Sequence, residues 1–518
     1  PEGALALAPA LIPVLETGQP LIWAAAAGQN GDIYVATGNN GQLYRLTAAM
    51  ARAAERSGQP VAARQALFFT APEPEIFAVA AGPDGAVYAA TSPHGKIYRI
   101  TPDGRSTVYF DPHTRYIWSL CFLGRTLYAG TGEQGIIYRI LPASGGQGAG
   151  KAFFRTGERQ VTVLATGPDG SLLAGTDPGG LIFRIATAQG LAGRGRVLYD
   201  SPLREISALV TANDGAVYAT AQGGAPGARE AVEAQAEQME TPAAAGAMTV
   251  VAESGQQQPA QAPGALPGGG NGEVTVTMGP GQIVPPDSGP ETVPEPNHGL
   301  RSAIYRIGPN GGVDTQWRSK TENAGPIWPA GEGGAEPWFG TGPRGRIYRL
   351  GPDQQATLIA QSGQQTITRL LSADGALWAA ASNTGTLYRL SPGPAAQGSF
   401  LSPIHDAGAV AQWGHLRWRT AAASPAAAGT GNLVFYTRSG DSARPNATWS
   451  QWSAPLTQPG QQITSPPGRF IQWKAVFRRA ASGSGPRLES VTLPYLPANR
   501  APVLTDLRAE TAATESTL

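Results

Sequence analysis

The stretch "TSPHGKIYRITPDG", from Thr91 to Gly104, decides the fold, because closely related phrases occur six more times along the chain. The uninterrupted copies are "VATGNNGQLYRL" (35–46), "AATSPHGKIYRI" (89–100), "AGTGEQGIIYRI" (129–140), "AGTDPGGLIFRI" (174–185), "FGTGPRGRIYRL" (339–350) and "AAASNTGTLYRL" (379–390). The remaining copy is split between "YATAQGG" (218–224) and "SAIYRI" (302–307). Where no insertion intervenes, the copies recur every 40 to 54 residues, which is the period of β-propeller blades.

Each repeat contains four short segments with the composition of β-strands. In the second repeat these are "EIFAVAAG" (75–82), "AVYAAT" (86–91), "KIYRI" (96–100) and "STVYF" (106–110). The turns between them contain Pro, Asp and Gly, which supply a fixed φ, a local hydrogen bond and a positive φ. Because one such sheet cannot bury both of its faces, the copies must pack against one another. The sequence therefore predicts an all-β, seven-bladed propeller.

The segment that precedes the first repeat supplies a closing strand in this interpretation. "ALIPVLETG" (10–18) has the character of a fourth strand, while no obvious fourth strand follows the seventh "LYRL". We expect the N-terminal segment to form the outer strand of blade seven, which would close the ring and remove the exposed sheet edges.

We expect the propeller to occupy residues 1–400, with a low-complexity insertion over 222–300 inside blade five. The insertion is rich in Ala, Gly, Pro, Gln and Glu, and it cannot bury enough apolar surface to offset its chain entropy. Most of it should be mobile or extended, with a short helical pattern at 228–240. Two interpretations stay open: a tolerated loop, or a docking arm for a neighbouring subunit or the cell envelope.

Residues 401–498 predict a C-terminal β-sandwich, because long strands there alternate aromatic or β-branched residues with polar ones. Residues 499–518 are interpreted as a tail or the start of a further module. Tryptophans are concentrated in the sandwich. They are either core residues or, at Trp449 and Trp452, a stacking platform for sugar rings.

Composition limits the classes of partner. Charged residues make up 14% of the 518 residues and the formal net charge is +1, so no bulk field attracts nucleic acid. No apolar run is long enough to span a bilayer. Cys121, the single cysteine, excludes an internal disulfide framework and a cysteine-based metal site. Because the chain begins at Pro1, we expect that a preceding segment was removed and that the protein is periplasmic or extracellular.

Three arginines occupy equivalent positions just before the first strands of successive repeats: Arg115, Arg159 and Arg204. The other four repeats have Pro20, Pro74, Gly325 and Gln365 at the aligned position. Three guanidinium groups at one mouth of the channel could hold a carboxylate or phosphate, which predicts a ligand-binding site. Glu75 and Glu205 are expected nearby, and they either belong to this site or pair with the arginines.

Two further repeated features are expected to be structural. The arginine of each "YR" pair should stack on an aromatic ring and bind turn carbonyls between blades; these are Arg45, Arg99, Arg139, Arg184, Arg306, Arg349 and Arg389. Trp23, Phe77, Trp118 and Trp328 should form a hydrophobic plug or a ligand wall. The five histidines lack metal-ligand spacing, and no catalytic motif has a credible context. No catalytic residue, metal or cofactor is therefore expected.

The phrase "GPDGAVYAATSPHGKIYRITPDG" (82–104) resembles the repeats of NHL-type and streptogramin-lyase-like propellers, and less closely those of bacterial lactonase-type and sensor-type propellers. The likeness covers residues 10–393 and is specific for the architecture, not for one family. The lyase-like group would imply a His/Glu pair with a metal, and the lactonase-like group an Asp/Glu/Asn metal cluster. The first strands here offer neither at matching places. The resemblance implies the fold and a bacterial, often exported, context.

Together these features predict a non-catalytic, exported binding or scaffold protein that uses its propeller and sandwich surfaces. The sequence leaves a protein partner, a homo-oligomer and a carbohydrate ligand open. The alternative is a propeller enzyme of the lyase or lactonase type with its active site in the channel. Fold alone does not choose between these functions.

Overall fold

The computed structural model describes residues 4–143, 146–188, 190, 192–223, 272–277, 299–330, 334, 336–421, 432–480 and 485–498. The chain divides into two compact units. One comprises Ala8–Ala247 and Pro280–Ala395, and the other Pro1–Leu7, Met248–Gly279 and Ala396–Leu518. No helix in the described part of the chain is long and apolar enough to cross a membrane.

The first unit is a ring of seven blades, as the repeats predict; six are four-stranded sheets, and blade seven has a short fifth strand. Blades one to three contain β2 (Ile22–Ala27), β3 (Ile33–Thr37), β4 (Gln42–Leu46) and β6 (Leu67–Thr70); β7 (Glu75–Ala81), β8 (Val87–Ser92), β9 (Ile97–Ile100) and β10 (Ser106–Phe110); and β11 (Ile117–Leu123), β12 (Thr126–Thr131), β13 (Ile136–Pro142) and β14 (Gly148–Arg155). Blades four and five contain β15 (Gln160–Thr166), β16 (Leu172–Asp177), β17 (Leu181–Ile185) and β18 (Gly195–Asp200); and β19 (Glu205–Thr211), β20 (Val217–Gln222), β22 (Ser302–Ile307) and β23 (Val313–Ser319). Blades six and seven contain β24 (Asn323–Trp328), β25 (Trp338–Gly342), β26 (Arg346–Leu350) and β27 (Ala356–Gln361); and β28 (Thr366–Ala373), β29 (Ala376–Ser382), β30 (Thr386–Pro394) and β1 (Pro9–Glu16).

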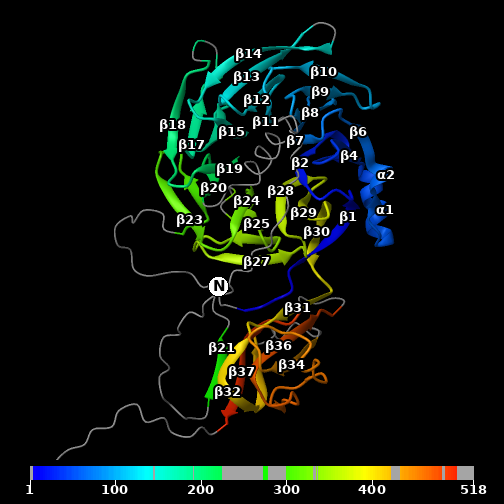
Figure 1. Cartoon of the computed structure of the whole chain (residues 1–518), viewed down its shortest axis with the longest axis vertical. Coiled ribbons are helices and arrows are strands. Elements are labelled where there is room, and N and C mark those ends of the chain that lie inside the picture. The colour runs from blue at the N-terminus through cyan, green and yellow to red at the C-terminus, as the bar shows by residue number, and fades with distance from the viewer. Residues whose placement is uncertain are drawn as a thin grey trace, which may run out of the picture. The chain divides into compact units, whose positions relative to one another are not determined.

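The first strand of each blade lies nearest the axis of the ring (Figure 1). These innermost strands touch one another in a closed circuit, β2–β7–β11–β15–β19–β24–β28 and back to β2. Neighbouring blades share hydrophobic clusters. Ala36 and Leu43 of blade one pack with Ile76, Ala89 and Tyr98 of blade two, and all five are buried. Each sheet thus buries its faces against the next sheet, which explains why one repeat cannot fold alone.

Blade seven is closed by the N-terminal strand, which confirms the predicted ring closure. Strand β1 pairs antiparallel with β30, from Pro9 opposite Pro394 to Glu16 opposite Thr386. Just beyond the strand, the Thr17 N–H donates to the Gly385 carbonyl at 2.9 Å. The two ends of the propeller sequence are therefore joined within one sheet, so neither end is left as an exposed edge.

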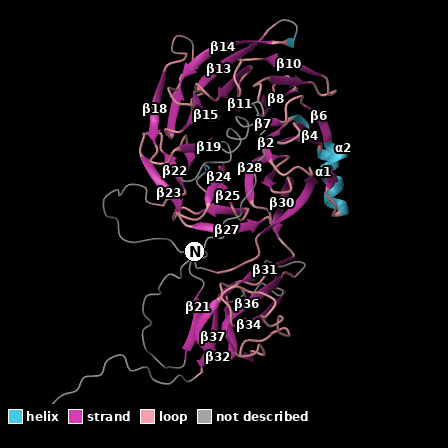
Figure 2. Cartoon of the chain, viewed as in Figure 1, coloured by secondary structure: helices cyan, strands magenta, loops and turns pink. Residues whose placement is uncertain are grey.

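Helix α1 (Ala48–Ser57), which no repeat predicts, comes between the third and fourth strands of blade one in the sequence, and Figure 2 shows it at the rim of the ring. The Thr47 side chain caps it by accepting from the Met50 N–H at 3.2 Å. Its buried Ala51 and Ala54 join a cluster with Leu15 of β1 and core residues of blades one and seven. A short strand, β5 (Val61–Ala62), pairs in parallel with β1, and α2 (Ala63–Ala66) follows. This insertion accounts for the 54-residue interval between the first two repeats, and it packs on the closing strand.

The second unit is a β-sandwich, also as predicted. Its strands are β31 (Gln397–Leu401), β32 (His405–Trp413), β33 (His415–Thr420), β34 (Asn432–Gly440), β35 (Gln461–Gln462), β36 (Gly468–Arg478) and β37 (Leu488–Pro497). Strand β36 pairs with β31 and β34, and β37 pairs with β33. Strand β32 changes sheets: His405 lies opposite Ile471 of β36, whereas Trp413 lies opposite Tyr495 of β37. Such a strand joins the two layers of a sandwich at a corner.

Two segments from elsewhere in the chain extend the sandwich. Leu5 forms a bridge with Leu488, so the residues before Ala8 group with the sandwich and not with the propeller. Strand β21 (Gly272–Thr277), from the blade-five insertion, pairs antiparallel with β37. This strand lies within the segment expected to be mobile or extended. The helical pattern at 228–240 and the C-terminal segment 499–518 lie outside the described residues.

The closing strand should contribute strongly to stability. Leu15 of β1 is fully buried, so Leu15→Ala should lower the free energy of unfolding by about 2–5 kcal/mol. Leu67→Ala is the matched control, because Leu67 is 42% exposed on blade one and should change stability by less than about 0.5 kcal/mol. Calorimetry of the full chain measures both. Equal effects of the two substitutions would contradict the role of β1 in closing the ring.

Candidate functional site

The turn between the second and third strands of a blade is bonded to the segment that enters the next blade. In blade three, the Gly135 N–H donates to the Arg159 carbonyl at 2.9 Å, and the Gly135 carbonyl accepts from the Thr156 N–H at 3.1 Å. Gly345 makes the same pair of bonds with Gln365 and Ser362, at 2.7 and 2.9 Å. Backbone groups therefore connect consecutive blades around the positions where site residues were predicted.

These turns explain the glycine of the repeated phrase. Gly95 has φ +52°, and a Cβ atom there would lie 1.8 Å from the Thr114 carbonyl oxygen. Both the left-handed conformation and the close approach of the next blade require glycine. The same holds in five more blades, where φ is 54–61° and a Cβ would lie 2.0–2.4 Å from a carbonyl oxygen: Gly41, Gly135, Gly180, Gly345 and Gly385.

Two of the three arginines of the predicted site lie within ion-pair distance of carboxylates. Arg115 Nε lies 3.8 Å from Glu133 Oε1, and Arg204 Nε lies 3.0 Å from Asp177 Oδ1. The backbone carbonyl of Arg159 accepts the inter-blade bond from Gly135. Two of the three guanidinium groups thus face carboxylates from strand or turn ends that the sequence analysis did not single out. Asp177 and Glu133 could have been found, because both fall in the turn phrases "TDPGG" and "TGEQG".

Glu75 binds the preceding blade. Its Oε2 accepts from Trp23 Nε1 at 2.6 Å, and its Oε1 accepts from the Asn39 N–H at 3.0 Å. Burial raises the pKa of the Glu75 carboxyl above its ordinary value, although the hydrogen bonds from Asn39 and Trp23 oppose the shift. Glu205 begins β19 and is half-buried. Through its two hydrogen bonds, Glu75 therefore joins blades one and two.

The sequence analysis aligned Gly325 of blade six with Arg115 of blade three, and this alignment was wrong by three residues. Ile117 pairs with Thr131 in blade three, and the corresponding pair in blade six is Ala324 with Thr341. The position equivalent to Arg115 is therefore Glu322, not Gly325. The dipeptide Ile-Trp, shared by blades three and six, suggested the wrong frame, whereas the strand pairing sets the true one.

The same shift removes Trp328 from the predicted aromatic group. Trp23, Phe77 and Trp118 do come together, with ring centroids 5.1 Å apart for the first pair and 4.5 Å for the second. Phe77 and Trp118 are only 3% and 2% exposed, which favours the plug over a ligand wall. Trp328 packs instead with the cluster shared by blades six and seven.

The entry segments also hold buried carboxylates that the sequence analysis missed. Glu322 is 3% exposed; its Oε1 accepts from Arg346 at 2.7 Å, and its Oε2 accepts from the Thr341 hydroxyl at 2.8 Å. Glu73, 5% exposed, accepts from the Tyr98 hydroxyl at 3.2 Å. Both carboxylates bind the third strand of their own blade, so their position before the first strand was the only sequence signal.

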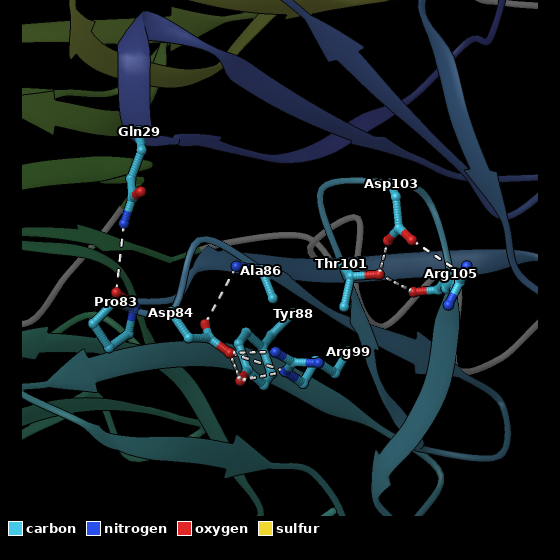
Figure 3. A network of polar contacts seen from close by, with 9 residues as sticks. All are labelled: Gln29, Pro83, Asp84, Ala86, Tyr88, Arg99, Thr101, Asp103 and Arg105. Carbon is cyan, nitrogen blue, oxygen red and sulfur yellow. Dashed lines mark hydrogen bonds and ion pairs between the residues drawn. The ribbon is translucent and has the colours of Figure 1, made fainter. Parts of the chain in front are cut away.

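Several of the repeated "YR" arginines bind carboxylates within their own blades, whereas Arg389 of blade seven binds Glu55 of α1 at 2.8 Å. Ion pairs of 2.6–2.8 Å join Arg45 to Asp32, Arg99 to Asp84, Arg184 to Asp169 and Arg306 to Asp214. Figure 3 shows Arg99 meeting Asp84 and the Tyr88 hydroxyl together. Burial raises the pKa of Asp84, but hydrogen bonds from Arg99 and Tyr88 outweigh it and hold the pKa below its ordinary value. The structural role holds, with a turn carboxylate as the main acceptor.

One arginine shows the predicted inter-blade contact as well. Arg45 Nη1 donates to the Pro102 carbonyl of blade two at 3.0 Å, and its guanidinium carbon lies 5.5 Å from the centroid of the Phe68 ring. The aspartate partner could have been predicted, because "GPDG" and "ANDG" place an acid in the turn between the first and second strands.

The two sandwich tryptophans differ in exposure. Trp449 is 5% exposed, and its Nε1 donates to the Ser442 carbonyl at 3.1 Å, so its ring does not present a free face to a sugar. Trp452 is half-buried, with the Arg438 guanidinium carbon 4.6 Å and the Lys474 ammonium 4.8 Å from its ring centroid. A platform of two exposed rings is therefore not what the structure has at these positions.

Other candidate groups are small or dispersed. Within the described residues, no three His, Cys, Asp or Glu side chains are arranged to hold a metal ion. A cavity of about 150 Å³ in the sandwich is lined mainly by apolar side chains, among them Ile404, Ile471 and Trp473, with His405 at its wall. Burial lowers the pKa of His405.

Comparison with known proteins finds similar solved structures at low sequence identity. A streptogramin B lyase has 13% identity and a TM-score of 0.45, covering 76% of this chain and 100% of the lyase chain. A virginiamycin B lyase from Staphylococcus aureus has 13% identity and a TM-score of 0.46, covering 74% and 99%. The extracellular domain of a putative hybrid two-component system from B. thetaiotaomicron has 11% identity and a TM-score of 0.45, covering 83% of this chain and 45% of that one. No protein-family model and no curated protein matches.

The turn glycines offer a test that separates backbone strain from inter-blade contact. Gly95→Ala introduces both a left-handed alanine and a clash with Thr114, and should lower the free energy of unfolding by about 2–5 kcal/mol. Gly124→Ala is the matched control, because Gly124 has φ +59° and no atom lies within 4 Å of the place a Cβ would take, so it should cost about 1–2 kcal/mol. Denaturant unfolding measures the difference. Equal costs would show that the next blade does not constrain this turn.

Proposed function

We propose that this chain is a non-catalytic binding or assembly protein, in which the propeller and the sandwich present surfaces to a protein or glycan partner. One observation supports it: carboxylates at the blade entries are bound to protein groups, either within their own blade or, for Glu75, in the preceding blade. Glu75 accepts from Asn39, Glu158 accepts from the Gly179 N–H at 2.8 Å, and Glu322 binds Arg346. General acid–base catalysis needs a group within reach of a substrate proton, whereas these groups bind protein atoms.

The proposed location is periplasmic or extracellular. Cys121 is compatible with an oxidising compartment, because burial raises the pKa of its thiol to about 12 and keeps the reactive thiolate scarce. A reporter fused to the chain and active only after export tests the location; a reporter active only in the cytoplasm would refute it.

Metal analysis separates the binding role from the alternative, a lyase- or lactonase-like propeller enzyme. Protein purified without chelator should contain well below one divalent ion per chain, and EDTA should leave its unfolding temperature unchanged. The reason is the composition of the entry segments, whose acidic side chains bind protein groups and form no three-ligand set among the described residues. A stoichiometric ion whose removal lowers the unfolding temperature would favour the enzyme.

An anion held by Arg115, Arg159 and Arg204, with Glu75 and Glu205 nearby, is a second proposal. The observation in its favour is that the side chains of Arg115 and Arg204 each stay 38% exposed although each contacts a carboxylate. A guanidinium carries five N–H donors, so one that is partly exposed can bind more than one acceptor.

Citrate or phosphate should therefore raise the unfolding temperature of the full chain, because a ligand that binds only the folded state stabilises it. The increase should disappear in Arg115→Gln/Arg204→Gln. It should persist in Arg105→Gln/Arg196→Gln, which removes the same charge from exposed positions. An increase of the same size in both double variants would be a general salt effect and would refute the site.

A further inference from the structure

The outward face of the sandwich sheet β31–β36–β34 gathers cations and aromatic rings. Tyr436 lies opposite Lys474 and Arg438 lies opposite Gln472, so these side chains share one face. The adjacent residues Phe435 and Trp473 are buried and point to the other face, into the core. We call Tyr436, Arg438, Trp452, Lys474 and Arg478 the cationic face.

Rings and cations alternate along this face. Arg438 lies between two tryptophans, with its guanidinium carbon 4.6 Å from the Trp452 centroid and 5.5 Å from that of Trp449. Lys474 lies between two rings as well, with its ammonium nitrogen 4.8 Å from the centroid of Trp452 and 4.8 Å from that of Tyr436. The ring contacts fix the positions of both cations, so less side-chain entropy is lost when they bind a ligand.

The charges on this face are not neutralised by acids. Among the described residues, no carboxylate lies within ion-pair distance of Arg438, Lys474 or Arg478. The two arginines donate to amide oxygens instead: Gln472 Oε1 lies 2.7 Å from Arg438 Nη2, and Gln397 Oε1 lies 3.1 Å from Arg478 Nε. Elsewhere in the sandwich, Arg419 binds Glu489 at 3.2 Å and Arg469 binds Asp406 at 2.8 Å. The cationic face therefore keeps positive charge that can bind an anion, whereas Arg419 and Arg469 are already paired with carboxylates.

The polar side chains around the cations can form hydrogen bonds with the hydroxyl groups of a ligand. Gln397 and Ser399 of β31 and Asn432 of β34 are exposed, and cross-strand pairing places them in the same rows as Arg478 and its neighbour Val476. Amide and hydroxyl side chains both donate and accept hydrogen bonds, as sugar hydroxyls do. One large apolar side chain, Leu401, is exposed beside Lys474, at 48%. A single such residue gives little anchorage to a lipid bilayer.

We propose that the cationic face binds an anionic polysaccharide, in which carboxylate or sulfate groups contact Arg438, Lys474 and Arg478 and neutral hydroxyls contact the flanking amides. The inference rests on the proposed binding role and names the ligand class of one surface. Charge complementarity and the polar flanks favour a glycan over a nucleic acid, since three cations on a chain of net charge +1 make a small electrostatic footprint.

Binding of the full chain to polygalacturonate and to a sulfated glycan, measured by affinity electrophoresis and calorimetry, tests the proposal. We expect binding to at least one of them and none to dextran. Arg438→Gln/Lys474→Gln should weaken it by about tenfold or more, because charge-assisted contacts are lost. Arg419→Gln/Arg469→Gln removes the same charge from paired arginines of the same unit and should leave the affinity within about twofold.

A third variant, Arg438→Lys/Lys474→Arg, keeps the charges and should keep most of the affinity, which distinguishes loss of charge from loss of packing if the glutamine variant is less stable. Equal binding by the two glutamine variants, or no binding to either anionic glycan, would overturn the proposal. So would stronger binding to polyglutamate or to vesicles of anionic phospholipid. These outcomes would refute the glycan site on the cationic face but not the proposed binding role of the chain. A stoichiometric metal ion in the channel would count against the binding role and would not test the cationic face.

Discussion

The propeller depends on one backbone contact, repeated around the ring: a left-handed glycine peptide whose N–H and carbonyl bind the segment entering the next blade. In blade three this contact joins Gly135 to Arg159 and Thr156. Since a Cβ atom at such a glycine would overlap a carbonyl oxygen, one position fixes both the turn conformation and the spacing between blades. Side chains at the blade entries, such as Glu75, add hydrogen bonds to this backbone frame.

The same contact closes the ring. Gly385 of blade seven accepts from Thr17, so the N-terminal strand is held by the contact that elsewhere joins successive repeats. Helix α1 then packs on that strand through Ala51 and Ala54 and shares a core with blades one and seven. The closure thus combines sheet pairing, the glycine contact and a hydrophobic cover.

The sequence was sufficient for blade number, strand order, the closing strand and the sandwich, because these follow from the period of the repeats and from alternation along strands. The sequence was not sufficient to align blade six, where two alignments three residues apart are possible. The Ile-Trp dipeptide shared with blade three favoured the wrong one, so Glu322 was not recognised as the equivalent of Arg115. Long-range partners also escaped it: the pairing of Arg204 with Asp177 depends on how two blades meet. Trp449 is buried and bonded to Ser442, seven residues earlier, in a loop where strand alternation predicts no burial.

Amide hydrogen exchange of the full chain, followed by mass spectrometry, tests the closed ring most directly. If β1 closes blade seven, peptides covering Pro9–Thr17 should be as protected as those covering the buried strand β29, because β1 could exchange only when the propeller opens as a whole. Rapid exchange of Pro9–Thr17, with β29 and β30 still protected, would contradict the account.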